Sequence, residues 1–336
     1  MIAPHLTSWK LLKKAPFHYH IIINPASGGG SGKQAGNDII ELLKKNQFLF
    51  STYFTQYPGH ERLFAKELIE STLIPWEEES IPADHPFPLL IVLGGDGTLH
   101  QVIDECHRLD SEVPIAYIPA GSGNDFARGF GISREAVKAF WNIVKTKEPQ
   151  TISILSYHEQ ISGTTGIALN NIGIGIDGAV IHQTTQKETK KHLKKFKLNS
   201  MAYIVSVLSV LFKQSGFPIL VEANGQEWNF KKAFLCTITN HPYFGGGIAI
   251  APSAKNNIPE FEFVLVERHS LFKIFFLIGM LIFKKQEKSK DFVHFATSKL
   301  RLTSTVPQYG QADGELLPES SFDLVVTPAT QQMWFC

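Results

Sequence analysis

The chain has 336 residues, of which 43% are hydrophobic and 19% charged, and its formal net charge is +1. This balance excludes a largely disordered chain and argues against a dedicated nucleic-acid binder. Three scattered cysteines, Cys106, Cys236 and Cys336, fit neither a disulfide framework nor a zinc spacing, which predicts a reducing, cytoplasmic location.

The first half of the chain alternates short apolar runs with helical patterns. Strands are expected at 20–23, 48–54, 89–93 and 114–118, and helices at 37–45, 61–69, 99–108 and 134–145. This alternation predicts an α/β domain, residues 1–150, with a mostly parallel sheet covered on both faces. The acidic, proline-bearing stretch 74–88 is expected to be a surface loop. In such folds, ligands gather at the carboxyl ends of the strands.

The first expected strand ends in a glycine-rich turn, residues 24–30, with the sequence NPASGGG. The following Gly32 and Lys33 invite comparison with a P-loop. That motif requires a glycine where this chain has Ser27, and Ser or Thr where it has Gln34. The Walker A interpretation therefore fails at two positions, and the turn taken alone is as typical of an ordinary loop as of a ligand site.

The third expected strand ends in GGDGT, residues 94–98. Glycine backbones can approach a phosphate closely, and their N–H groups can point at its oxygens. The helix expected from Leu99 would add its positive N-terminus. We therefore predict a phosphate-binding turn in which Asp96 lies near a nucleotide or its metal.

A third turn, within residues 118–128, adds a hydroxyl, an amide and a carboxylate from Ser122, Asn124 and Asp125. Asn and Asp also favour turns for purely local reasons, so this stretch alone decides little. All three turns follow strands of the same predicted sheet. We therefore expect them to meet in one crevice.

After about residue 150 strand-like runs dominate. They are expected at 151–155, 166–172, 218–223, 228–239, 261–266, 299–305 and 322–327. The pattern predicts a β-rich second domain, residues 151–317, with residues 318–336 returning to the first domain. The formal GxGxxG at 173–178 lies far from the first strand and helix, so we do not interpret it as a dinucleotide fingerprint. Asp177 within it is expected to face the cleft between the domains.

The sequence YGQADGE, residues 309–315, places Asp313 and Glu315 two residues apart, on one face if the segment is extended. Such a pair beside a nucleotide could supply a general base and its supporting carboxylate. Asp-Gly is also a strong hairpin signal, and the spacing alone favours the hairpin.

Two apolar stretches, 201–212 and 271–283, are too short to span a hydrocarbon layer roughly 30 Å thick. They adjoin lysine runs at 187–197 and 284–290. A basic cluster beside an apolar face suits an anionic membrane surface, although a solvated face flanking a core helix is commoner. The histidines form no zinc spacing, and His100 is expected to be an ordinary helix residue.

Taken in order, these motifs resemble the diacylglycerol kinase catalytic-domain family, most closely its bacterial soluble lipid kinases. The resemblance rests on residues 23–30, 55–60, 94–98, 121–128, 171–178, 245–252 and 313–315. GGDGT alone is shared with NAD kinases and phosphofructokinases, whereas the ordered set is more specific. The resemblance implies a nucleotide-binding α/β domain like that of NAD kinases and phosphofructokinases, an all-β sandwich as the C-terminal domain, and a cleft between them.

The same resemblance implies an ATP- and Mg²⁺-dependent lipid kinase that phosphorylates a hydroxyl of diacylglycerol or a related lipid at the membrane surface. It places ATP near Asn24, Pro25, Ser27, Gly28, Thr55, Gly94, Gly95, Asp96, Gly97, Thr98, Ser122 and Asn124. Asp313 or Glu315 would be the general base, with the other carboxylate supporting it. Asp96, Asp125 and Asp177 resemble the carboxylates that organise magnesium in the family.

One position departs from the family pattern. Related kinases carry Asp-Gly shortly after the Ala-Pro of residues 251–252 and hold a structural magnesium there, whereas this chain has Ile258 and Pro259. Neither side chain offers the oxygen that magnesium requires, which leaves Asn256 or Asn257 as substitutes.

Two other functions stay open from sequence, namely an NAD kinase-like enzyme and a non-catalytic, nucleotide-dependent membrane or regulatory module. The lipid acceptor and the formation of a homodimer are not fixed by the motifs, because pocket shape decides the first and surface packing the second.

Overall fold

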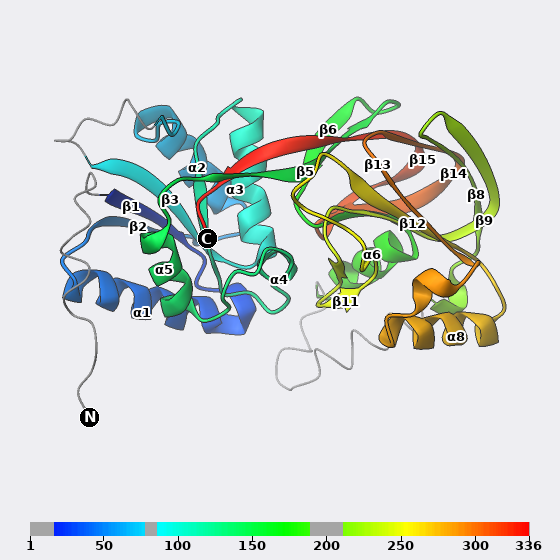
Figure 1. Ribbon diagram of the computed structural model, residues 1–336, viewed down its shortest axis with the longest axis horizontal. Coiled ribbons are helices and arrows are strands. Elements are labelled where there is room, and N and C mark those ends of the chain that lie inside the picture. The colour runs from blue at the N-terminus through cyan, green and yellow to red at the C-terminus, as the bar shows by residue number, and fades with distance from the viewer. Residues whose placement is uncertain (1–16, 78–85, 189–210, 336) are drawn as a thin grey trace.

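The computed structural model describes residues 17–77, 86–188 and 211–335, which form two lobes side by side (Figure 1). The N-terminal lobe contains β1 (Phe17–Ile23), η2 (Ser27–Gly30), α1 (Ser31–Lys45), β2 (Leu49–Phe54), α2 (His60–Ser71), β3 (Phe87–Gly94), α3 (Asp96–Arg108), β4 (Ile115–Pro119), α4 (Asp125–Gly129) and α5 (Ala136–Lys145). Its central strands are rich in apolar residues, as expected for strands that are covered on both faces.

The strand register brings three turns to one edge of this lobe. Ile23 of β1 lies beside Leu93 of β3, and Leu93 lies beside Ile118 of β4, in parallel pairs. Because the strands run in the same direction and end level with one another, the turns that follow them emerge together. The expected helix at 37–45 begins earlier, at Ser31, directly after the glycines of η2.

The C-terminal lobe is built mainly of strands. It contains β5 (Gln150–Glu159), β6 (Thr164–Ala168), β7 (Asn171–Gly175), α6 (Ile176–Glu188), β8 (Phe217–Ala223), β9 (Gln226–Thr239), β10 (Tyr243–Phe244), β11 (Ile248–Ala249), β12 (Phe261–Glu267), α8 (Leu271–Ile282), η3 (Gln286–Lys288), β13 (Phe292–Thr297), β14 (Leu300–Ala312) and β15 (Glu315–Met333). Its core is a cluster of buried apolar side chains separate from the core of the N-terminal lobe.

Hydrogen bonds join strands of both lobes into one 13-stranded sheet. Among the described strands, the parallel pairs are β1–β2, β1–β3, β3–β4 and a single residue pair between β15 and β4. The remaining pairs are antiparallel. A mostly parallel sheet therefore does not describe this sheet as a whole, because the β-rich half of the chain joins it through antiparallel pairs.

β15 passes from one lobe to the other. It pairs with β14 from Glu315 to Val326 and with β5 from Leu324 to Met333, and Met333 reaches Ile115 of β4. Trp334 follows, fully buried, and its Nε1 donates to the carbonyl oxygen of Ile143 at 3.1 Å. Since β5 and β15 serve both lobes, the division at residues 150 and 317 stays a prediction.

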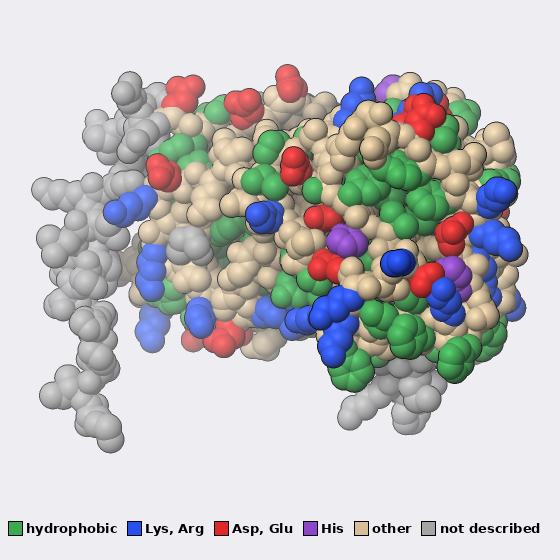
Figure 2. Space-filling view, turned by 45° about the vertical axis from the view of Figure 1, so that its right-hand side comes forward, with side chains coloured by type: hydrophobic (Ala, Val, Ile, Leu, Met, Phe, Trp, Pro, Cys, Tyr) green, Lys and Arg blue, Asp and Glu red, His purple; other side chains and the backbone are tan. Residues whose placement is uncertain are grey.

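Some expected segments differ from the structure or lie outside it. Pro88, expected in a surface loop, is the second residue of β3. The expected apolar stretch 201–212 and lysine run 187–197 lie almost wholly outside the described residues. α8 lies at the lower edge of the C-terminal lobe, where Figure 2 shows hydrophobic side chains beside Lys and Arg. Among the helices that the structure describes, none is long and apolar enough to cross a bilayer.

Candidate functional site

Three glycine-rich turns meet at the carboxyl ends of β1, β3 and β4. Between the first two turns, Asn24 Nδ2 donates to Thr98 Oγ1 at 2.9 Å, and the N–H of Gly95 donates to Ser27 Oγ at 3.2 Å. These bonds connect residues about seventy positions apart in the sequence. The expected crevice is therefore present in the fold.

Two glycines allow this close approach. A Cβ on Gly121 would lie 2.6 Å from the Cα of Gly95, so the second and third turns could not touch as they do. Gly28 has a φ of +59°, and a Cβ there would collide with the carbonyl oxygen of Ala120 and with Ser31 Oγ. The turns thus pack backbone to backbone, which favours the binding of an extended anion such as a polyphosphate.

The other residues expected to contact ATP lie in or beside these turns. The N–H of Thr55 donates to the carbonyl oxygen of Ile23 at 2.9 Å, which fixes the end of β2 next to the first turn. Gly97 and Ser122 are exposed, Pro25 is half-buried and Gly94 is buried.

Asn124 has a local role in the third turn. It has a φ of 52°, and its side chain exchanges hydrogen bonds of 2.9 and 2.8 Å with the backbone of Gly121. Both ends of its amide are therefore used within the turn. Asn124 thus shapes the turn, and its contact with ATP stays a prediction.

Asp96 lies where the second and third turns join. Its carboxylate accepts hydrogen bonds from the backbone N–H of Asp125 at 3.0 Å and of Phe126 at 3.3 Å. Burial raises the pKa of Asp96 to about 6, and the negative charges of Asp125 and Asp313 act in the same direction. The three carboxylates therefore lie close enough to influence one another.

Asp125 connects the third turn to the C-terminal lobe. Its carboxylate contacts the Arg128 guanidinium and accepts a hydrogen bond from the N–H of Gly246 at 2.6 Å. The same guanidinium lies 5.5 Å from the ring centre of Tyr243. The GGG loop, residues 245–247, which the sequence singled out, is thus held against the phosphate-binding edge.

Asp313 and Gly314 form a two-residue hairpin turn. Ala312 of β14 pairs with Glu315 of β15, and the φ angles of the two turn residues are 51° and 88°. Positive φ at both positions is typical of the type I′ turn that Asp-Gly favours, so the expected hairpin is confirmed. The turn also separates the two carboxylates, because the Asp313 side chain is fully buried while Glu315 is exposed.

The Asp313 carboxylate accepts four hydrogen bonds. His100 Nδ1 lies 2.8 Å from it, and the backbone N–H groups of Leu169, Asn170 and Asn171 lie at 2.5, 2.8 and 3.1 Å. Burial alone raises the pKa of this carboxyl, but the His100 contact and the backbone donors outweigh burial and hold the pKa below its usual value. Asp313 is therefore ionised, and its acceptor positions are filled.

His100 lies within α3, as expected, and its ring contacts the buried Asp313 carboxylate. Burial lowers its pKa, but the bond to Asp313 and that residue's charge reverse the effect and leave the pKa raised. Nδ1 of His100 makes the contact with Asp313, so Nε2 is the ring nitrogen that this contact leaves available. The sequence carried a signal that His100 lies near the phosphate-binding edge. Asp96 and His100 are four residues apart on α3 and so share a helix face.

Glu315 lies at the rim of the same site. Its Oε1 accepts a hydrogen bond from Gln101 Nε2 at 3.2 Å, so both residues that follow Leu99 on α3 contact the hairpin. Exposure leaves this carboxylate accessible to a substrate at the rim.

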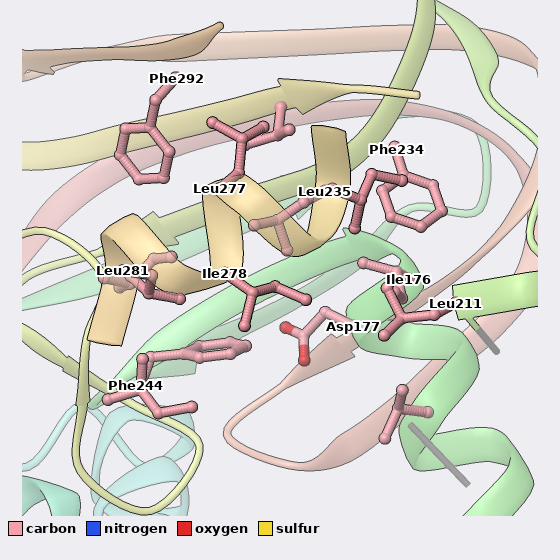
Figure 3. Close-up of a pocket in the computed structure, with 15 residues that line it drawn as sticks. Ile176, Asp177, Leu211, Phe234, Leu235, Phe244, Leu277, Ile278, Leu281 and Phe292 are labelled. Atoms are coloured by element: carbon pink, nitrogen blue, oxygen red, sulfur yellow. The ribbon is translucent and has the colours of Figure 1, made fainter. Parts of the chain in front are cut away.

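An apolar pocket of about 230 Å³ lies between α6, α8 and the sheet. It is lined by Ile176, Asp177, Val180, Leu211, Phe234, Leu235, Phe244, Ile248, Ile250, Val266, Ile274, Leu277, Ile278, Leu281 and Phe292. Figure 3 shows the Asp177 carboxylate pointing into the pocket between Phe244 and Ile278. Burial raises the pKa of Asp177 to about 6. Asp177 thus faces this pocket inside the C-terminal lobe, and the expected interdomain position is wrong.

Gln311 links the apolar pocket to the hairpin. Its Nε2 donates to Asp177 at 2.6 Å and to Asn171 Oδ1 at 2.5 Å, while its Oε1 accepts from the N–H of Gly314 at 2.7 Å. A continuous set of hydrogen bonds therefore runs from the pocket carboxylate through Gln311 to the turn that contains Asp313.

The expected magnesium carboxylates do not form one cluster. Asp96, Asp125 and Asp177 have different partners, and within the residues that the structure describes no three His, Cys, Asp or Glu side chains are placed to hold a metal. Magnesium is usually bound by one or two carboxylates together with substrate phosphates, a role that Asp96 fits. Asn256, one of the two expected substitutes at the second site, donates from Nδ2 to the carbonyl oxygen of Gly129 at 2.9 Å.

A second hollow adjoins the glycine turns. It is an open groove of about 540 Å³ between α1, the third turn and the start of α5, and Gln34, Asp38, Gly121 and Arg134 are among its lining residues. Its mixed polar and apolar walls differ from the apolar pocket. The groove begins at the third turn, since Gly121 and Asn124 are among its lining residues.

Two family models match this chain, one over each half. Residues 18–157 match the model of the diacylglycerol kinase catalytic domain, and residues 170–334 match that of the YegS C-terminal NAD kinase beta sandwich-like domain. The chain is 27% identical over 319 residues to the Bacillus subtilis protein named "Putative lipid kinase YtlR", covering 93% of this chain and 97% of that protein. It is 25% identical to a B. subtilis diacylglycerol kinase, covering 88% of each.

A solved structure shares the fold. The crystal structure titled "a putative diacylglycerol kinase from Bacillus anthracis str. Sterne" superposes with a TM-score of 0.72 at 19% identity and covers 96% of each chain. At this identity the likeness supports the two-lobed fold alone.

Proposed function

Because the chain belongs to the diacylglycerol kinase catalytic-domain family, we propose that it is an ATP- and Mg²⁺-dependent lipid kinase that phosphorylates a hydroxyl of diacylglycerol or a related lipid. One observation carries the proposal. The polyphosphate-binding turns, an Asp–His pair and an apolar pocket are connected through the hairpin at residues 312–315. The enzyme would act in the cytoplasm at a membrane surface, where such lipids are found.

ATP is proposed to bind with its phosphates over the three turns and its nucleoside in the adjoining groove. The backbone N–H groups of the first two turns and the N-terminus of α3 favour negative charge. Asp96 would be the protein ligand of a magnesium ion that also binds the phosphates, and that ion would offset charge on the phosphate oxygens. Positioning and charge stabilisation supply most of the catalysis in such transfers.

The proton acceptor is proposed to be His100, held by Asp313. The lipid oxygen forms a bond to the γ-phosphorus, the bond from that phosphorus to the bridging oxygen breaks, and ADP leaves. The hydroxyl proton passes to Nε2 of His100, because the four acceptor positions of Asp313 are already filled. Asp313 then stabilises the imidazolium. Glu315 at the rim is the alternative acceptor.

The apolar pocket is proposed to hold an acyl chain of the lipid. Its lining offers apolar contact along most of its length and one polar side chain, that of Asp177. Through Gln311 that carboxylate is connected to the hairpin, so occupation of the pocket would bring the lipid headgroup toward the phosphate-binding turns.

A phosphoryl-transfer assay tests the function directly. The purified chain is incubated with labelled ATP, Mg²⁺ and a panel of dispersed lipids that includes diacylglycerol, and the products are identified by mass. We expect label on a lipid hydroxyl and none on NAD in a parallel reaction. Label on NAD would favour an NAD kinase-like enzyme. ATP binding without any labelled lipid would favour a non-catalytic module, and either result overturns the proposal.

A further inference from the structure

α8 is apolar apart from Lys273, although the helix lies at the surface. Its sequence is LFKIFFLIGMLI, and the inward side chains, such as Ile274 and Leu277, line the apolar pocket. On the other side, Phe272 is 86% exposed and Phe276 60%, and Phe283 just after the helix is 74% exposed. A helix that is hydrophobic all round is normally buried in a core or in a membrane.

These outward side chains form one surface, which we call the α8 face: Phe272, Phe275, Phe276, Ile282 and Phe283. Isolated exposed apolar residues are ordinary, but several large ones on a single helix mark an interaction site. Figure 2 shows hydrophobic side chains gathered along this edge of the molecule, with Lys and Arg beside them. The α8 face therefore needs an apolar partner.

Basic residues flank the α8 face at both ends. At its start, Lys213, Lys232 and Arg268 line an open groove of about 640 Å³. Nη1 of Arg268 is buried there without a hydrogen-bond partner, and the guanidinium lies 4.8 Å from the ring centre of Phe234, which also lines the apolar pocket. Nearby, Glu267 accepts a hydrogen bond from the backbone N–H of Lys232.

At the other end of α8, Lys284, Lys285 and Lys288 are exposed on the turn that follows the helix. Two acidic residues lie near these lysines: Lys273 Nζ donates to Asp291 at 2.7 Å, and the exposed Glu287 accepts a hydrogen bond from Ser253 Oγ at 3.0 Å. The α8 face thus combines apolar side chains with positive charge on both sides, a pattern that complements an anionic lipid surface.

We propose that the α8 face docks on an anionic lipid bilayer, with the phenylalanines entering the interface and the two basic clusters contacting anionic headgroups. A second copy of the chain fits less well, because a symmetric contact would bring like-charged clusters together. The inner side of α8 forms a wall of the apolar pocket, so docking would set that pocket beside the acyl chains. The inference rests on the proposed function in this respect alone, because bilayer binding is measurable without catalysis.

Vesicle co-sedimentation of the full chain tests the docking. Vesicles are made of phosphatidylcholine alone or with a third of phosphatidylglycerol, and the partition coefficient is measured for each variant. The wild type should bind the anionic vesicles. F272E/F276E should lower the partition coefficient at least tenfold, and K284Q/K285Q about 25-fold, at about fivefold for each lysine. The lysine variant should change little on phosphatidylcholine.

Matched controls come from the other surfaces. Ile161 is 63% exposed on the β5–β6 turn, and Lys44 and Lys45 end α1. I161E and K44Q/K45Q should bind the vesicles as the wild type does. Circular dichroism checks folding, and K284Q/K285Q carries the test alone if F272E/F276E does not fold.

The proposal is overturned if F272E/F276E and K284Q/K285Q both partition as the wild type does. It is also overturned if the wild type is a dimer and these variants are monomers that bind vesicles as the wild type does. Kinase assays on a water-soluble short-chain lipid and on vesicle-embedded lipid separate the two proposals. F272E/F276E should lose activity only on the embedded lipid. If the wild type phosphorylates neither lipid but F272E/F276E binds vesicles less well than the wild type, the docking is supported and the kinase function is refuted. If the wild type phosphorylates both lipids and the two variants partition as the wild type does, the kinase function is supported and the docking is refuted.

Discussion

Replacement of Asp313 by Asn tests the buried carboxylate that connects the β14–β15 hairpin to α3. The four groups that point at the Asp313 carboxylate are donors: three backbone N–H groups and His100 Nδ1. An Asn side chain offers one acceptor oxygen and one NH₂ group. The NH₂ group would face two donors at 2.5 to 3.1 Å and could accept from neither.

The expected cost follows from those contacts. Each buried donor left without an acceptor costs about 1–3 kcal/mol. Removal of one partner from a buried charge pair costs about 3–5 kcal/mol in total, a figure that already includes such losses. We therefore expect Asp313→Asn to lower the free energy of unfolding by about 3–5 kcal/mol.

Urea unfolding at pH 6, followed by circular dichroism, measures this loss. Asp110 provides a matched control, because it has the same φ of 51° but an exposed side chain. Asp110→Asn should change the free energy of unfolding by less than about 0.5 kcal/mol. A loss below about 1 kcal/mol for Asp313→Asn would contradict the interpretation that Asp313 is ionised and that its carboxylate accepts four hydrogen bonds.

Asp313→Asn should also change how the free energy of unfolding depends on pH. The folded-state pKa of Asp313 is below 3.8, so its stabilisation is present above that value and is lost as the pH falls through the folded pKa. The pKa of His100 is above 6.5, so its stabilisation is present below that value and is lost as the pH rises through the folded pKa. The pair should stabilise the fold most between about pH 4 and 6.5, and Asp313→Asn should flatten this maximum.

Three further predictions concern activity. If His100 accepts the proton, kcat should rise with pH through a pKa above 6.5, and His100→Asn should lower kcat about 10²–10⁴-fold and abolish that rise; an unchanged pH profile would assign the proton to another group. Gly121→Ala should weaken ATP binding at least tenfold in calorimetry because its Cβ would meet Gly95, whereas Gly279→Ala, with open space around its Cβ, should bind normally; equal affinities contradict the packed turns. Leu277→Trp should fill the apolar pocket and raise KM for long-chain lipids more than for short-chain ones, and a uniform effect would place the acyl chain elsewhere.

Much of the phosphate-binding edge could be predicted from the sequence, because its determinants are local. Apolar runs that end in glycine and polar residues mark the strand ends, and parallel strands of similar length place those ends together. The Asp-Gly hairpin at 313–314 was likewise predictable, because only a two-residue preference for positive φ is involved.

The partners of Asp313 depended on the tertiary structure. His100 is 213 positions away in the sequence and reaches Asp313 only because α3 packs beside the β14–β15 hairpin. For the same reason Asp313 is buried while Glu315, two residues on, is exposed, which no spacing rule reveals.

By itself the sequence determined the strand ends, the glycine turns, the hairpin and the family resemblance, since each depends on backbone preferences within a few residues. Only the tertiary structure decided that strands from both lobes form one sheet with mainly antiparallel pairs, that Asp177 faces an apolar pocket, and that α8 leaves phenylalanines exposed. Those features arise from contacts between distant segments, where burial and charge depend on which surfaces pack together.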